Sequence, residues 1–415
     1  MELFNIIAVL ITLSALFGYL NHRYIKLPTT IGLMFISILM SLVMVILGHL
    51  GQIGYGIEKQ WLGMMRDIDF NKTLMVGMLS FLLFAGALHV DLQELLKQKW
   101  QIGVLATIGV ILSTIIIGSC LYLILGWVGI HLTFIACLLF GALISPTDPI
   151  AVLGILRKAG AAKDVEIRIT GEALFNDGIG VVVFITLLKL ANGGLEISPG
   201  QMMLLAGGEI IGGITLGLAT GWIAYRLLKS IDNYQIEIMI TLALVMGSYA
   251  LATIIHTSGP IAIVVAGLLI GNHGRQFAMS VKTRENLDMF WELIDEILNA
   301  LLFVLIGLEL LVITLNVSSV HAGLIAVPVV LCARILSVGV PQLFMSLGKK
   351  FDLKFLRIMT WGGLRGGISV ALALSLPAGF ARDSIITMTY TVVVFSIMVQ
   401  GLTIKHLIKH SEEVL

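Results

Sequence analysis

Charged residues are scarce in this sequence. Asp, Glu, Lys and Arg make up 12% of its 415 residues, whereas about a quarter is usual in a soluble domain. Apolar residues make up 58%. A chain of this composition belongs in a lipid bilayer. Its net charge of +1 is uninformative by itself, because in membrane proteins the placement of Lys and Arg matters more than their sum. No nucleic-acid partner is implied.

Cysteine is scarce as well. Cys120, Cys137 and Cys332 all fall inside apolar stretches, which excludes a disulfide framework and a CxxC metal site. We expect no cofactor. The first apolar run, residues 3–20, lacks the basic leader and cleavage site of a signal peptide, so we interpret it as a retained helix.

Long apolar runs recur from end to end of the chain, and no polar stretch between them is long enough for a soluble domain. About 20 apolar residues cross a bilayer as a helix. We therefore predict an all-α integral membrane protein, residues 1–415 forming one transmembrane domain of about 13 helices. The predicted spans are 3–20, 28–50, 71–90, 102–126, 131–158, 171–191, 201–227, 236–255, 258–273, 290–314, 321–346, 355–378 and 385–408.

The basic residues separate cleanly between the two sides that these spans define. Of the 26 Lys and Arg residues, nineteen lie on the side of the first connector, four lie on the opposite side and three lie within spans. Basic connectors stay in the cytoplasm. We expect a multi-pass protein of the plasma or inner membrane, with its N-terminus outside and its C-terminus cytoplasmic.

The fifth predicted helix is interrupted. It contains Pro146 and Pro149 on either side of Thr147 and Asp148. Each proline removes a backbone donor, and lipid offers the freed carbonyls no new partner. This segment must therefore be lined by protein or water, where Asp148 can offset the positive end of the following half-helix.

The twelfth predicted helix is interrupted too. Gly363 and Gly366 flank a pair of residues that includes Arg365, which could offset exposed carbonyls of that helix. The fifth and twelfth helices are each fifth in a six-helix unit, and the two units run in opposite directions through the membrane. We predict inverted repeats, a common transporter architecture, with the broken helices crossing at the midplane. The first repeat covers residues 1–191, a linking helix 201–227, and the second repeat 236–410.

The sixth predicted helix carries Glu172, Asn176 and Asp177 before it becomes wholly apolar. Ionisable groups inside a bilayer are costly, so a functional role is expected for Asp177. Loss of water favours the protonated form of a carboxylate, and a small cation competes for the same oxygens. Asn176 adds no charge and could orient Thr147. One carboxylate then carries one proton or one cation in alternation, which makes the exchange 1:1 and electroneutral.

At these residues the sequence resembles the monovalent cation/proton antiporters of the NhaP and NHE type. The resemblance rests on Gly-Glu-x-Leu-x-Asn-Asp at 171–177, Thr-Asp-Pro at 147–149, Gly-Leu-Arg-Gly at 363–366, and weaker segments in order along the chain. It implies a thirteen-helix fold, a homodimer, and a Na⁺ site for which Asp177 and Thr147 supply ligands, with Asn176 and Asp148 beside them.

The resemblance also implies particular roles for the buried charges. Glu172 would form a structural ion pair with Arg365, and Arg334 would be a further buried charge facing carbonyls or acidic residues. Two positions depart from the family pattern, because Ala173 replaces a common serine and Ala85 an acidic residue. Backbone oxygens or water would then complete the ligand shell.

The function predicted from the sequence is a secondary transporter, with no catalytic residue, that exchanges Na⁺ for H⁺ and serves pH homeostasis. Li⁺ and K⁺ remain open as alternative cations. The competing hypothesis is a sodium-coupled symporter of a small organic anion, for which the third, fourth and ninth predicted helices look too apolar.

Overall fold

The protein is described by a computed structural model that covers residues 3–50, 77–149, 152–154, 156, 163–192, 199–311, 316–345, 353–377, 379 and 381–412. Within these residues the chain is helical apart from its connectors, and it contains one isolated β-bridge. Eight helical segments are long and apolar enough to cross a membrane. The prediction of an all-α membrane protein is confirmed.

The helices follow the predicted order, although parts of the spans 71–90 and 131–158 lie outside the described residues. They are α1 (Leu3–Leu20), α2 (Thr29–Leu50), α5 (Leu79–Leu88), α6 (Leu92–Lys97), α7 (Lys99–Val104), α8 (Val110–Trp127), α9 (Phe134–Ile144), α11 (Lys163–Ala191), α12 (Pro199–Leu228), α13 (Tyr234–Ile254), α14 (Gly259–Leu269), α15 (Arg275–Phe277), α16 (Val281–Glu309), α17 (Val317–Met345), α18 (Leu353–Gly362), α19 (Gly367–Leu374), α20 (Arg382–Phe395) and α21 (Gly401–Glu412).

Two helices begin at least two turns earlier than the predicted spans. Helix α11 begins at Lys163 rather than at 171, and α16 begins at Val281 rather than at 290. The added turns are polar. A prediction from hydropathy ends where the apolar residues end, whereas the hydrogen-bonded helix extends beyond them. The Ser280 side chain accepts a hydrogen bond from the Thr283 N–H at 3.3 Å and caps the start of α16.

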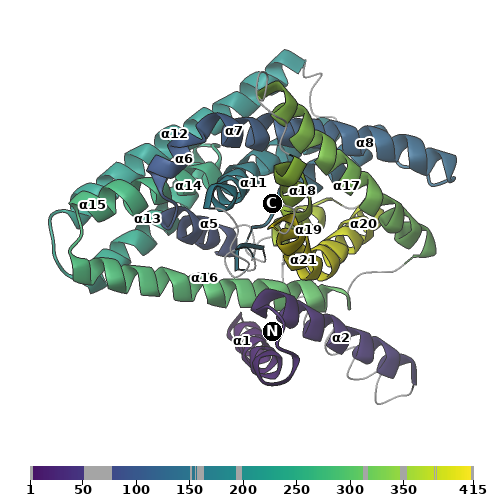
Figure 1. The fold of residues 1–415 in the computed structure, drawn as a ribbon, viewed down its shortest axis with the longest axis horizontal. Helices are drawn as coiled ribbons and strands as arrows, with labels where there is room; N and C mark the ends of the chain where they lie inside the picture. The colour runs from purple at the N-terminus through teal and green to yellow at the C-terminus, as the bar shows by residue number, and fades with distance from the viewer. Residues whose placement is uncertain are drawn as a thin grey trace.

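The long helix α16 runs along one side of the molecule, with α1 and α2 beyond it (Figure 1). Helices α12, α13 and α14 gather with α5 at one end, and α8, α17 and α20 lie at the other. Helices α11, α18 and α19 lie at the centre. The segments that carry the predicted site therefore sit inside a ring of apolar helices.

Small residues let some of these helices approach closely. A side-chain Cβ at Gly141 of α9 would come within 2.5 Å of the Thr114 carbonyl oxygen of α8. Such contacts are typical of membrane helices, where close packing replaces the hydrophobic effect as the main attraction. They fix α9 firmly up to the point where it ends.

Both predicted breaks are present, and they cross. Helix α9 ends at Ile144 and the chain continues through Ser145–Pro149 without helix, while α18 ends at Gly362 and α19 begins at Gly367. The two non-helical segments form an antiparallel bridge, in which the Asp148 N–H donates to the Leu364 carbonyl at 2.8 Å. Each segment thus satisfies part of the backbone that the other leaves free.

Candidate functional site

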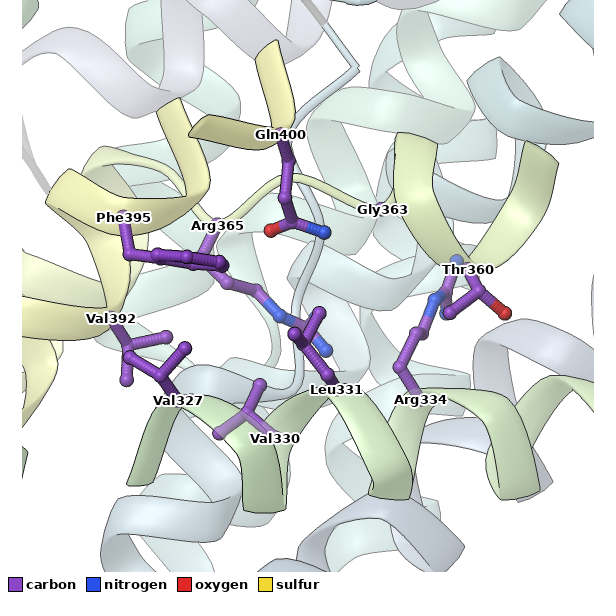
Figure 2. Close-up of a pocket in the computed structure, with 10 residues that line it drawn as sticks. All are labelled: Val327, Val330, Leu331, Arg334, Thr360, Gly363, Arg365, Val392, Phe395 and Gln400. Carbon is purple, nitrogen blue, oxygen red and sulfur yellow. The ribbon is translucent and has the colours of Figure 1, made fainter. Parts of the chain in front are cut away.

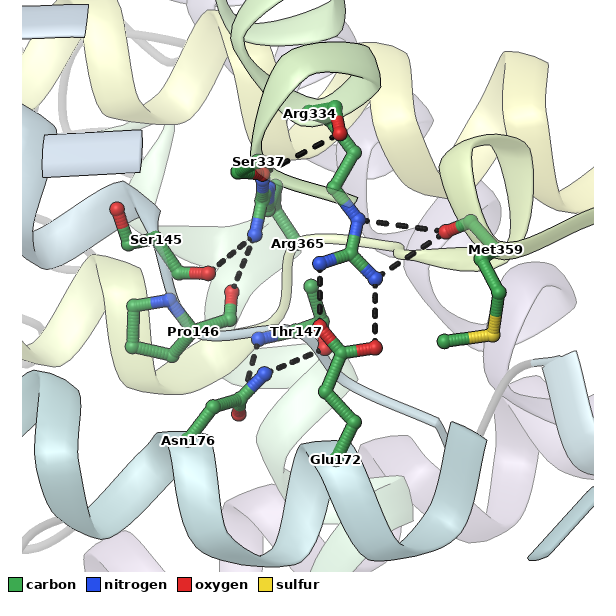
Figure 3. A network of polar contacts seen from close by, with 9 residues as sticks. All are labelled: Ser145, Pro146, Thr147, Glu172, Asn176, Arg334, Ser337, Met359 and Arg365. Carbon is green, nitrogen blue, oxygen red and sulfur yellow. Dashed lines mark hydrogen bonds and ion pairs between the residues drawn. The ribbon is translucent and has the colours of Figure 1, made fainter. Parts of the chain in front are cut away.

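Arg365 holds the crossing together from the side of the second break. Its Nη1 donates to the carbonyl oxygens of Ser145 and Pro146 at 2.5 and 3.0 Å (Figure 3). These are carbonyls that the end of α9 leaves without helical partners, at the negative pole of the helix dipole. The prediction that Arg365 offsets carbonyls of its own helix is thus corrected, because the carbonyls belong to the other broken helix.

Asn176 joins α11 to the first break. Its amide nitrogen donates to the Thr147 hydroxyl at 2.8 Å, and its carbonyl oxygen accepts from the Thr147 N–H at 3.3 Å. Both residues are almost fully buried, at 1% and 4% exposed. The predicted contact between Asn176 and Thr147 is confirmed, and it fixes the non-helical segment against α11.

Asp177 follows on the next position of α11 and is 8% exposed. In the described part of the chain its carboxylate has no hydrogen-bond donor and no basic partner. The Asp148 carboxylate is close enough to repel its negative charge. Ala173, one turn earlier on the same helix, is buried and supplies no hydroxyl. The arrangement leaves anionic oxygens that only a proton, a cation or water can satisfy.

The turn that carries Asp177 is held in place by close packing. A Cβ at Gly178 would come within 2.7 Å of the Ile261 side chain of α14, and Gly180 lies directly against Pro146. The glycines therefore allow α11 to press on both α14 and the first break. This packing leaves the Asp177 carboxylate little room to move away from the crossing.

Asp148 lies in the first break, is partly buried and packs against the second break. Its side chain rests on Gly366, where any Cβ would collide with the carboxylate. The structure thus brings Asp148 to the crossing beside Asp177, as the sequence predicts. Pro149, which follows it, accepts the first backbone hydrogen bonds of the next half-helix from Val152 and Leu153.

Glu172 pairs with Arg334, which corrects the predicted pair with Arg365. The Arg334 Nη1 and Nη2 donate to the two Glu172 carboxylate oxygens at 2.5 and 2.9 Å, a bidentate ion pair. Nε and Nη2 also donate to the Met359 carbonyl at 3.3 and 3.1 Å. The partners predicted for Arg334, carbonyls and acidic residues, are therefore the ones it has.

Sequence spacing could not choose between the two arginines, because Arg334 on α17 and Arg365 in the second break are both buried and both far from Glu172 in the chain. The structure shows how the space is divided between them. A Cβ at Gly363 would come within 2.7 Å of the Arg334 Nε atom, so this glycine makes room for Arg334 rather than for Arg365. Gly363 therefore leaves space for the Glu172–Arg334 ion pair, whereas Gly366 leaves space for the Asp148 side chain.

The residues that support Arg365 were not predicted from the sequence. Its backbone N–H donates to the Ser396 hydroxyl at 3.0 Å, and Ser396 donates to the Gln400 side chain at 2.6 Å. Polar residues one turn apart in the last predicted span were the available signal. Both arginines also reach a small cavity that Asp177 does not line (Figure 2). The cavity is lined by Val327, Val330, Leu331, Arg334, Thr360, Gly363, Arg365, Val392, Phe395 and Gln400.

Comparison with known proteins points to one family. The family described as "Sodium/hydrogen exchanger, transmembrane" matches residues 11–410. The Na⁺/H⁺ antiporter NhaP of Pseudomonas aeruginosa is 49% identical over 410 residues, which cover 98% of this chain and 96% of that protein. The Na⁺/H⁺ antiporter NhaH of Halobacillus dabanensis is 37% identical over 82% of this chain and 83% of its own length.

The fold has a close counterpart among solved structures. The sodium proton antiporter MjNhaP1 of Methanocaldococcus jannaschii superposes with a TM-score of 0.76, covering 99% of each chain at 19% sequence identity. At this identity the likeness is one of fold. It extends over nearly all of this chain.

Proposed function

Because the chain belongs to the transmembrane sodium/hydrogen exchanger family, we propose that it exchanges Na⁺ for H⁺ across the membrane, with Asp177 as the carrier of both ions. The observation that supports this role is the environment of the Asp177 carboxylate. The carboxylate lies almost fully buried at the crossing of two broken helices and has no donor or basic partner among the described residues.

A carboxylate in this position binds a proton and a cation in competition. Both neutralise the same oxygens, so each excludes the other while it is bound. If the site opens to one side of the membrane and then to the other, proton binding on one side exchanges for sodium binding on the other. With one carboxylate, each half of the cycle carries one positive charge, and the exchange is 1:1 and electroneutral.

The cation ligands come from the crossing. Thr147 presents its hydroxyl oxygen, and Asn176 holds Thr147 in position. Asp148 adds negative charge nearby. With Ala173 and Ala85 in place of two oxygen-bearing side chains, backbone carbonyls and water complete the shell, and Li⁺ and K⁺ compete with Na⁺ for it.

The alternative, a sodium-coupled symporter of an organic anion, is not favoured. Buried residues of α5 and α14 are mostly apolar, and they offer few groups to bind a carboxylate or hydroxyl of such a substrate. The family and its relatives carry antiport names. We therefore treat the protein as a transporter rather than an enzyme.

The proposal also includes the membrane location, the orientation and the assembly of the transporter. It is a multi-pass protein of the cell membrane, and the segregation of its basic residues orients the N-terminus outside and the C-terminus in the cytoplasm. Two copies form a homodimer, as the family resemblance implies. The repeats at 1–191 and 236–410 would move relative to each other as the site changes sides.

Purified protein in liposomes loaded with a pH-sensitive dye tests the function. Adding Na⁺, Li⁺ or K⁺ to acid-loaded vesicles should release protons through the wild-type protein and not through Asp177→Asn. The matched control is Asp164→Asn, the same change at an exposed position of the same helix, which should retain exchange. Cation-driven proton release that persists unchanged in Asp177→Asn would overturn the carrier assignment.

A further inference from the structure

Helix α16 presents a half-buried carboxylate, Asp295, on the face that packs against the crossing. Leu302 on this face fills the space at Gly367, where a Cβ would come within 2.9 Å of its side chain. Asp295 lies seven residues earlier, which is two turns and about 10 Å along the helix on the same face. It therefore lies between the N-terminal end of α16 and the crossing.

Asp295 is electrostatically linked to the site. The Asp148 carboxylate is close enough to repel both Asp295 and Asp177. Asp295 also forms no ion pair with any described residue. The three carboxylates thus form a series in which Asp148 is the shared neighbour of an outer carboxylate and the carrier.

Asn299 adds an independent observation. It is 3% exposed, and its side chain contacts the Asp295 carboxylate from one turn further along α16. Its side-chain oxygen is buried and finds no hydrogen-bond donor within the described residues. A buried acceptor without a donor is unfavourable, and here it lies beside a negative charge. An ion with positive charge and an affinity for oxygen satisfies both groups.

The other acidic residues at the start of α16 are different. Glu292 and Glu296 are exposed, as acidic residues on the solvated face of a helix usually are. They can raise the local cation concentration by long-range attraction. Asp288, nearer the start of the helix, already pairs with Arg275. Within the described part of this helix, Asp295 is the partly buried carboxylate that forms no ion pair and contacts Asn299.

We propose that Asp295 and Asn299 form a relay site, where a monovalent cation binds on its way between the solvent at the N-terminal end of α16 and Asp177. The inference rests on the proposed function and adds a second binding step to it. Oxygen ligands from Asp295 and Asn299 replace part of the water that the cation loses as it approaches the buried carrier.

The test measures sodium dependence from each side of the membrane separately. In everted vesicles, Asp295→Asn should raise the KM for Na⁺ about fivefold, a change expected from losing one favourable charge interaction, with the maximal rate changed by less than about twofold. In right-side-out vesicles the KM should not change. Asn299→Ala should give the same one-sided effect, and it provides a second variant if Asp295→Asn does not assemble.

Glu296→Gln is the matched control, because it removes the same charge at the next residue of α16 from an exposed position. Its KM should stay close to wild type. An unchanged KM in Asp295→Asn, an equal rise in Glu296→Gln, or an equal rise from both sides would each overturn the relay site. Absence of sodium-driven proton movement in the wild type would instead refute the proposed function.

Discussion

At the residue scale, the Thr147 hydroxyl has two roles, as acceptor for Asn176 and as proposed ligand of the cation. Thr147→Val keeps the shape of the side chain but leaves the Asn176 amide without its acceptor. A buried donor left unpaired costs about 1–3 kcal/mol. We expect thermal unfolding at a lower temperature and a KM for Na⁺ that rises about tenfold, measured by sodium titration of proton release.

Thr147→Ser is the control for this prediction. It restores the hydroxyl and removes only a methyl group, so its KM and unfolding temperature should lie near those of the wild type. If Thr147→Val and Thr147→Ser bound sodium equally well, the hydroxyl would not be a ligand, and backbone carbonyls and water would complete the cation's shell beside Asp177.

The sequence predicted the chemistry of the site better than the pairing of its charges. The sequence predicted that Asn176 and Asp177 lie near Thr147. Polar groups on the broken helix and on the helix that carries the carboxylate have few other polar partners inside the bilayer. Two buried arginines could have paired with Glu172. The pairing with Arg334 depends on the space that Gly363 leaves for the Arg334 side chain. Packing of this kind depends on three-dimensional space that spacing along the chain does not encode.

At the element scale, the crossing depends on the close approach of two non-helical segments. A methyl group at Gly366 would collide with the Asp148 side chain, which is fixed by its backbone bond to Leu364. Gly366→Ala should therefore separate the segments, abolish exchange and lower the unfolding temperature. Proton release and thermal unfolding of the purified variant measure both effects.

A matched glycine is available on α17. A Cβ at Gly339 would meet only the end of the Leu356 side chain, at 3.5 Å, an ordinary contact. Gly339→Ala should therefore leave exchange and stability near wild type. A Gly366→Ala protein that exchanged ions normally would show that the bridge between the two breaks is dispensable.

The presence of the helices could be predicted from the sequence, but the residues at which they begin could not. Apolar runs located the helices within the described residues, because a bilayer requires about 20 such residues. The polar first turns of α11 and α16 were not predicted, because they extend beyond the lipid, where hydropathy does not indicate a helix. The breaks were predictable from Pro146, Pro149 and the glycines around Arg365, but their direct pairing through Asp148 and Leu364 was not, because backbone pairing leaves no side-chain signature.

At the scale of the whole molecule, the proposed cycle fixes how transport responds to voltage. The carrier region holds Asp177, the neighbouring Asp148, the Glu172–Arg334 pair and Arg365, and only Asp177 exchanges its ion. If either one proton or one Na⁺ neutralises it, the loaded carrier has the same charge in both directions. No net charge then crosses the membrane in a complete cycle.

Proteoliposomes with a potassium gradient and valinomycin can set membrane potentials of either sign. Moving one elementary charge through 100 mV is worth about 2.3 kcal/mol, so a cycle that carried one net charge would change its driving force strongly between the two signs. We expect the sodium-driven proton flux to be the same at both signs and at zero potential. Flux that followed the sign of the potential would require a second titrating group, with Asp148, whose carboxylate is close enough to repel Asp177, as the first candidate.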